Sequence, residues 1–206
     1  MIKIERVSVM NFENAIRGAR NPMNSWEKSD SAYDEAGNYV LGEADRTFGN
    51  KLCRAGSDER KFIRQIFVSL DITAPLYWWK EFDTYKIGTV ANSTSTMHKI
   101  HAKPFTREDF SHDRLDEGGL AVLDSLIEYL ERERLAFCEN REERQSWHNM
   151  IQLLPSSFNQ MRTVTLNYEN LVNIYYARRA HKLAEWHTFC DWIKTLPYAE
   201  DFILIK

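Results

Sequence analysis

A cluster of small polar side chains is the part of this chain best equipped to bind a ligand. The residues from Thr89 to Thr96 carry hydroxyl or amide groups at most positions, with Asn92 and Thr94 among them. These groups donate and accept hydrogen bonds, which suits a phosphate or a sugar. The alternative is an ordinary solvated loop, because most loops of this composition bind nothing. Residue types alone leave both interpretations open.

Two histidines follow the cluster, but their surroundings argue against a metal site. His98 and His101 have no carboxylate or thiol at ligand spacing beside them. The three cysteines, Cys53, Cys138 and Cys190, are far apart and form no CxxC pair. We therefore expect no bound metal, and reduced buried thiols in place of disulfides.

A strand and a helix precede the polar cluster and must position it. From Phe67 to Ile72 the β-branched and aromatic residues recur with a period near two, which predicts a strand that Pro75 closes. Pro75 also suits the first turn of a helix, in which apolar residues recur at spacings of three and four. We expect Glu81 on a flank of this helix and Gly88 at its end.

The rest of the chain alternates further strand and helix patterns. Period-two runs predict strands at 2–9 and 162–166, and period-3.6 runs predict the helices, which we place at 11–20, 43–55, 115–140, 141–153, from Asn167 onward, and at 183–196. Residues 21–38 read as a long exposed loop whose Trp26 needs a cover. The pattern predicts one α/β (α+β) domain over residues 1–206, with its strands in one sheet packed against the 115–140 helix.

Composition excludes several classes of partner. The 206 residues are 43% hydrophobic and 13% aromatic, enough for a substantial core, and the formal net charge is −3 with both signs interspersed. No basic patch predicts binding to duplex nucleic acid or to an anionic membrane. No apolar run approaches the roughly 20 residues that span a bilayer, and the first residues read as a strand instead of a signal peptide. We expect a cytoplasmic protein.

Three segments together resemble one known family. They are AIRGAR (Ala15–Arg20), ITAPLYWW (Ile72–Trp79) and the run from Leu153 to Trp186 that ends in ARRAHKLAEW. In that order and at similar spacing they resemble the Ala-Val-Arg-Ala-Ala-Arg helix, the VKAPIF-type passage and the Arg-Ala-x-x-x-Ala-Gln-Trp helix of the flavin-dependent thymidylate synthases. The resemblance implies a twisted, mostly antiparallel sheet packed with long helices. It also implies a homotetramer whose subunits share their sites.

The same resemblance implies an activity and a set of site residues. Enzymes of this family methylate deoxyuridine monophosphate (dUMP) with a flavin, FAD, and a methylene folate. The flavin supplies the hydride, so the resemblance identifies no catalytic side chain. The positions that match substrate contacts are Glu81, Asn92, Thr94 and Arg179, and Arg162 lies within one residue of a further nucleotide-binding Arg of the family. Those that match flavin contacts are Tyr85, Lys86, Asn167 and Asn173.

The chain departs from the family at its signature. Thr84, Tyr85 and Lys86 stand where the family has Arg-His-Arg, and Thr96 and Glu169 each replace an Arg. Because Arg offers a planar bidentate fork that Thr and Lys lack, the changes at Thr84, Thr96 and Glu169 predict weaker binding of the family's anionic ligands. Thr84 and Glu169 match the flavin side of the family's site, and Thr96 matches the nucleotide side. Nearby hydroxyls, or a shifted arginine such as Arg17, Arg20 or Arg178, are the groups that could compensate.

Three classes of function remain open at this stage. The chain is a divergent flavin-dependent methyltransferase acting on a pyrimidine deoxynucleotide, a nucleotide-binding or sequestering protein without flavin, or an assembly protein with a vestigial cleft. Surface or interface ion pairs are the alternative role for Arg162, Arg178 and Arg179. Core or interface packing is the alternative for the aromatic candidates Trp78, Trp79, Tyr85 and Tyr175. The sequence does not indicate whether folate is used.

Overall fold

The computed structural model describes residues 2–142 and 144–205, and these form two compact units. Unit 1 holds residues 2–4, 72–84 and 92–163, and unit 2 holds residues 5–71, 85–91 and 164–205. Each unit is described by itself below. That the whole chain acts as one domain stays a prediction.

The main sheet has four strands in the order β1-β4-β6-β5. They are β1 (Lys3–Met10), β4 (Phe67–Pro75), β6 (Asn159–Asn167) and β5 (Val90–Ser93). Strands β4 and β6 run antiparallel, since the Leu76 amide donates to the Phe158 carbonyl and the Tyr168 amide donates to the Ile66 carbonyl, each at 3.0 Å. The predicted sharing of one sheet by the three recognised runs is confirmed. The sequence pattern did not predict β5, which lies in the polar cluster.

The burial of β4 follows its alternating sequence. Val68, Leu70, Ile72 and Ala74 are fully buried, whereas the residues between them are partly exposed. In unit 1 the strand leads into α3 (Leu76–Phe82), which buries Trp78, Trp79 and Phe82. These two tryptophans are therefore core residues. The helix ends at Phe82, six residues before the Gly88 that was expected to end it.

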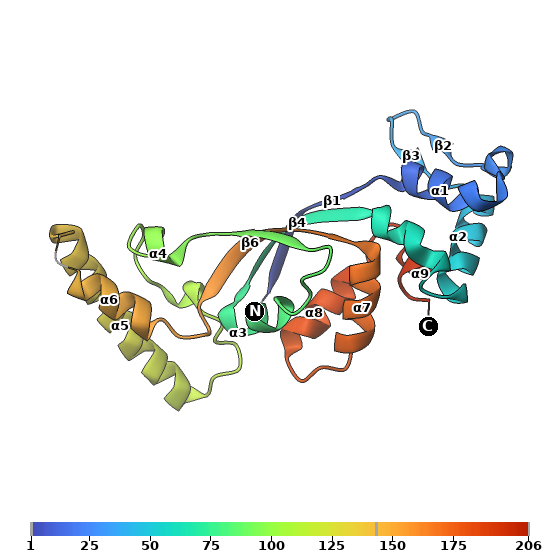
Figure 1. Cartoon of the computed structure of the whole chain (residues 1–206). Helices are drawn as coiled ribbons and strands as arrows, with labels where there is room; N and C mark the ends of the chain where they lie inside the picture. The colour runs from blue at the N-terminus through green and yellow to red at the C-terminus, as the bar shows by residue number, and fades with distance from the viewer. Residues whose placement is uncertain (1, 143, 206) are drawn as a thin grey trace. The chain divides into compact units, whose positions relative to one another are not determined.

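Unit 1 also contains a pair of helices, α5 (Glu117–Glu139) and α6 (Gln145–Leu153), which lie side by side (Figure 1). Leu123, Leu130 and Phe137 of α5 pack with Met150 of α6 and with the aromatic residues of the 100–110 segment. The placement of this long helix on the sheet was wrong: its buried face is covered by α6 and by that segment. Short elements complete the unit: α4 (Thr96–Lys99) and the 3₁₀ turn η4 (Arg107–Asp109).

Unit 2 holds most of the remaining helices. They are α1 (Phe12–Arg20), α2 (Glu43–Ala55), η3 (Glu59–Gln65), α7 (Tyr168–Arg178), α8 (Ala184–Ile193) and α9 (Ala199–Phe202). The expected bounds of α2 are confirmed. Tyr168 at the start of α7 is fully buried, and its hydroxyl donates to the Pro197 carbonyl at 2.7 Å.

The 21–38 segment of unit 2 is more ordered than a loop. It contains the 3₁₀ turns η1 (Asn21–Met23) and η2 (Trp26–Lys28), and β2 (Ala32–Tyr33), which pairs antiparallel with β3 (Tyr39–Val40). Trp26 is 49% exposed, so the expected cover is not present within the described chain.

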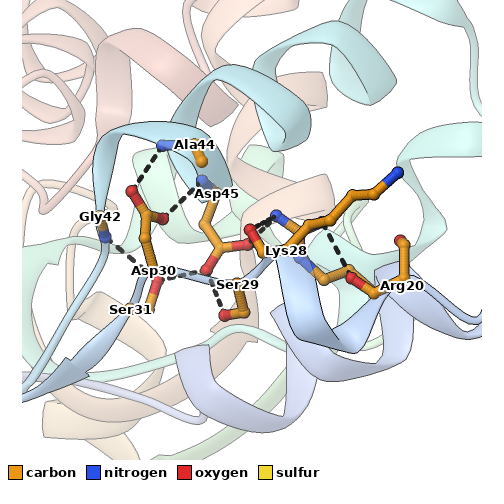
Figure 2. Close-up of polar contacts among 9 residues, drawn as sticks. Arg20, Lys28, Ser29, Asp30, Ser31, Gly42, Ala44 and Asp45 are labelled. Carbon is orange, nitrogen blue, oxygen red and sulfur yellow. Dashed lines mark hydrogen bonds and ion pairs between the residues drawn. The ribbon is translucent and has the colours of Figure 1, made fainter.

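Hydrogen bonds to the buried Asp45 tie this segment to α2, and an ion pair with the same carboxylate ties α1 to α2 (Figure 2). Asp45 is fully buried and accepts from Arg20 Nε at 2.7 Å and from the hydroxyls of Ser29 and Ser31 at 2.6 Å each. Asp30 caps the same helix by accepting from the Asp45 amide at 3.0 Å. Arg20 is therefore a structural residue whose charge is neutralised by Asp45.

The described residues hold no cluster of potential metal ligands, and none of their helices is long and apolar enough to cross a membrane. The three cysteines are free. Burial raises the pKa of Cys53 to about 12 and that of Cys190 to about 11, as expected for unreactive thiols. Cys138 is exposed, so the expectation that all three are buried was wrong.

Candidate functional site

Arg162 in unit 1 is held by the protein itself. Its Nη1 lies 2.7 Å from Asp83 Oδ1, and its guanidinium stacks 4.2 Å from the centre of the Trp79 ring. Its Nε donates to the side chain of Gln160 at 3.0 Å. The side chain is only 16% exposed. These contacts fix the Arg162 guanidinium in place, and Asp83 partly neutralises its charge.

Glu81, Asn92 and Thr94 also belong to unit 1. Glu81 is partly buried on α3, and Asn92 is exposed on β5. The Thr94 amide donates to the Met161 carbonyl at 2.9 Å, and Thr94 and Met161 line one cavity. Because successive residues of a strand face opposite sides, Arg162 faces away from Met161 and Thr94. The structure therefore does not bring Thr94 and Arg162 together within unit 1.

Two exposed cations in unit 2 are available to an anionic ligand. Arg179 follows α7 and stacks over Tyr176, with 4.9 Å between its guanidinium carbon and the ring centre. Lys86 lies in the turn after α3. Among the described residues neither side chain has a carboxylate partner. Both could meet a phosphate without first breaking an ion pair.

Tyr85 has an internal role. Its hydroxyl accepts from Arg178 Nε at 2.9 Å, and the Arg178 guanidinium also stacks over Trp186, 4.8 Å from that ring centre. Trp186 is fully buried. Arg178 thereby links Tyr85 to α7 and α8. Because its guanidinium is used in these contacts, Arg178 does not replace an arginine that the resembled family has at its flavin site.

Asn167 serves as the N-cap of α7. Its side chain accepts from the Asn170 amide at 3.0 Å, and the Asn170 side chain accepts from the Asn167 amide at 3.1 Å. Asn170 Nδ2 also donates to the Ile87 carbonyl at 2.7 Å, which docks the 85–91 turn on the helix start. Asn173, one turn further along, is exposed. The predicted start of a helix at Asn167 is confirmed.

Glu169, at a position where the resembled family has Arg, is paired inside unit 2. Arg60 of η3 reaches both of its carboxylate oxygens, with nitrogen–oxygen distances of 2.8, 3.0 and 3.2 Å. The side chains are 13% and 12% exposed. The hydrogen bonds to Glu169 raise the pKa of Arg60 above its ordinary value. The reversed charge at position 169 is thus matched by a local cation.

The other proposed compensating arginines are also accounted for. Arg20 is buried against Asp45, as described above. Arg17 is exposed on α1 and donates to Asn14 at 2.6 Å. Of Arg17, Arg20 and Arg178, only Arg17 reaches solvent without a carboxylate or aromatic partner among the described residues.

No family model and no curated protein sequence matches this chain. Solved structures do match its fold over nearly the full length. Thymidylate synthase X (ThyX) from Helicobacter pylori with FAD and dUMP is 14% identical, with a TM-score of 0.70 over 98% of this chain and 97% of that one. A second H. pylori ThyX complex with FAD and dUMP gives 15% identity and a TM-score of 0.68, with 97% of each chain covered.

A related structure has a different recorded activity. The UMP/dUMP methylase PolB from Streptomyces cacaoi, bound with 5-Br dUMP, is 13% identical, with a TM-score of 0.66 over 99% of this chain and 95% of that one. This chain has a ThyX-like fold. The predicted fold class, a mostly antiparallel sheet with long helices of flavin-dependent thymidylate synthase type, is confirmed.

Sequence reasoning missed two residues that matter at the site. Arg60 lies in a basic stretch that reads as surface, and only its contact with Glu169 shows that the two are complementary. Lys99 follows the polar cluster directly and lines the same cavity as Thr94. The signal for Lys99 was its spacing of three from Thr96 on a helical turn.

Proposed function

We propose that this protein binds a phosphorylated pyrimidine deoxynucleotide such as dUMP, with one-carbon transfer as the ancestral reaction. The ThyX-like fold supports the proposal, because the three compared structures contain dUMP or its 5-bromo derivative. The proposed substrate contacts are Glu81, Asn92, Thr94, Arg162 and Arg179. Since Thr94 and Arg162 face opposite ways within unit 1, the proposal includes sites to which more than one subunit of a homo-oligomer contributes.

The observation that carries the proposal is that Arg179 is exposed and unneutralised by any carboxylate among the described residues. Its guanidinium is exposed and has no carboxylate partner among the described residues, whereas Arg60, Arg162 and Arg20 are each paired with an acid. A charge-assisted bidentate contact with a phosphate is stronger than a neutral hydrogen bond. Arg179 is therefore the cation best placed to hold a nucleotide phosphate.

The flavin-side residues fit FAD poorly. Tyr85 is bonded to Arg178 and Asn167 caps α7, so both side chains are already used in the fold. Glu169 adds a carboxylate where the resembled family has a cation, and it is neutralised by Arg60. Only Lys86 and Asn173 remain exposed for a flavin pyrophosphate. We propose that FAD is bound more weakly than in the resembled family, or not at all.

The Arg60–Glu169 pair favours a second candidate function. A protein that needs no flavin could bind or sequester the nucleotide without methylating it. In that case the carboxylate of Glu169 does not weaken ligand binding, because no cofactor phosphate approaches it. Nucleotide binding without turnover and without flavin would distinguish this candidate from a flavin-dependent methyltransferase.

Calorimetric titration with dUMP tests the proposal. Arg179→Ala should weaken dUMP binding by about ten- to a hundredfold, the value of a hydrogen bond to a charged group. Arg132→Ala is the control, because Arg132 is also exposed and stacks over a tyrosine three residues earlier, 4.8 Å from the ring of Tyr129, but lies 3.9 Å from the Glu133 carboxylate. Equal dUMP affinities in the two variants, or no dUMP binding by the wild-type protein, would contradict the proposal.

A further inference from the structure

Unit 1 contains a cavity of about 560 Å³, and Thr94 is the only proposed substrate contact among its described lining residues. It lies among the residues that follow β5, up to Asp109, and the first residues of β6. Cavities of roughly 300 to 1,000 Å³ commonly hold small ligands. The volume is therefore sufficient for a mononucleotide.

The cavity has the lining expected of a small-molecule site. Most of its surface is apolar and includes the aromatic side chains of Phe105 and Phe158, with Met161 beside them. Thr94 and Thr96 add hydroxyl groups. An apolar wall with a few polar groups that fix orientation is typical of ligand pockets. A flat aromatic base suits such a wall.

The charged groups of the lining differ in how they are already used. Lys103 pairs with Asp109, which also accepts from the Thr106 amide at 2.9 Å. Glu108 belongs to the same segment, and a hydrogen bond from the Thr106 side chain lowers its pKa. Lys99 has no carboxylate partner among the described residues. It is the lining cation left for an incoming anion.

Lys99 also stands at an informative position on α4. It lies three residues after Thr96, so the two side chains share one face of that helical turn, and both line the cavity. Thr96 replaces an Arg of the resembled family, and no described residue hydrogen-bonds its hydroxyl. Lys99 returns a positive charge to the same face one turn later.

We propose that Lys99, with the Thr96 hydroxyl, is a second group that binds the nucleotide phosphate, in addition to the Arg179 of a shared site, while the base lies against Phe105 and Phe158. The inference rests on the proposed function and names an additional specificity-determining residue for it. It also gives the base an apolar wall supplied by the protein, which does not depend on a flavin.

The test compares dUMP with uncharged deoxyuridine in calorimetric titrations. Lys99→Ala should weaken dUMP binding about tenfold and leave deoxyuridine binding unchanged, because only the phosphate meets the lysine. Lys80→Ala, at an exposed lysine of unit 1 outside the cavity, is the control and should change neither. Thr96→Arg in the Lys99→Ala background should restore dUMP affinity. Ala102→Trp, at an exposed lining position, should block both ligands.

The outcomes separate this inference from the proposed function. If dUMP binds and Arg179→Ala weakens it, but Lys99→Ala behaves like Lys80→Ala, this cavity is not the phosphate site and only the inference fails. If Lys99→Ala weakens deoxyuridine as much as dUMP, the phosphate contact is also refuted. If the wild-type protein binds no dUMP, both the proposed function and the inference fail.

Discussion

At the scale of single residues, this chain has an acid, Glu169, where the resembled family has an arginine, and Arg60 pairs with that acid. Glu169 would repel an anionic cofactor, but Arg60 meets it through a bidentate contact in unit 2. The sequence resemblance matched Glu169 to an arginine on the flavin side of the family's site. The resemblance did not identify Arg60 as the partner, because Arg60 and Glu169 are 109 positions apart in the sequence and only the fold brings them together.

Removing Glu169 should therefore cost stability. Glu169→Gln leaves Arg60 as a mostly buried cation with a neutral partner, and we expect the free energy of unfolding to fall by about 2 to 3 kcal/mol. Urea denaturation measures this. Asp124→Asn is the control, because its partner Arg107 is half exposed and such surface pairs contribute about 0 to 1 kcal/mol. Similar losses in both variants would show that the Arg60–Glu169 pair is no stronger than a surface pair.

Asp45 predicts a pH dependence of stability. Burial alone would raise the pKa of this carboxyl, but hydrogen bonds from Ser29, Ser31 and Arg20 outweigh burial, and the pKa lies below its ordinary value. A depressed pKa in the folded state stabilises the protein above the unfolded-state pKa of about 3.9, and this stabilisation is lost as the pH falls further. The difference in unfolding free energy between wild type and Asp45→Asn should therefore shrink below about pH 4.

A control isolates the effect of burial. Asp191 is 70% exposed and pairs with Lys194 on the same helix, so Asp191→Asn should change the unfolding free energy little at any pH. A wild-type advantage over Asp45→Asn that stays constant down to strongly acidic pH would contradict the account of the buried carboxylate.

At the scale of elements, the sequence predicted β4, α2 and the start of α7, because each carries its own local pattern in the sequence. It failed where tertiary contacts decide. The helix expected to reach Gly88 ends at Phe82, and the 85–91 turn instead docks on α7 through Asn170. The hairpin of β2 and β3 was missed because each strand has only two residues.

Gly88 makes that docking possible. Its φ is +74°, and a Cβ there would lie 2.9 Å from Asn167 Nδ2 and 3.2 Å from Asn170 Oδ1. Gly88→Ala should lower the unfolding free energy by about 2 kcal/mol, through backbone strain and the displaced cap. Gly37→Ala is the matched control, since Gly37 has a φ of +82° with nothing within 4 Å. Equal losses in urea denaturation would mean that the contact with α7 adds nothing.

At the scale of the whole molecule, we expect a homo-oligomer, and a tetramer by resemblance. The described surface carries large apolar side chains that a monomer leaves in water, including Ile87 at 90% and Val122 at 70% exposure. Sedimentation equilibrium should give about four times the chain mass of 24.3 kDa. A monomer at micromolar concentration would contradict both the tetramer and sites shared between subunits.

The central claim is that nucleotide binding is kept while the hold on flavin is weakened. The most direct measurement is a pair of titrations on the same wild-type preparation, one with dUMP and one with FAD, after recording the visible absorbance of the purified protein. We expect no copurified flavin band, saturable dUMP binding, and FAD binding that is weaker than dUMP binding or undetectable. Stoichiometric flavin in the purified protein, or FAD bound more tightly than dUMP, would contradict it.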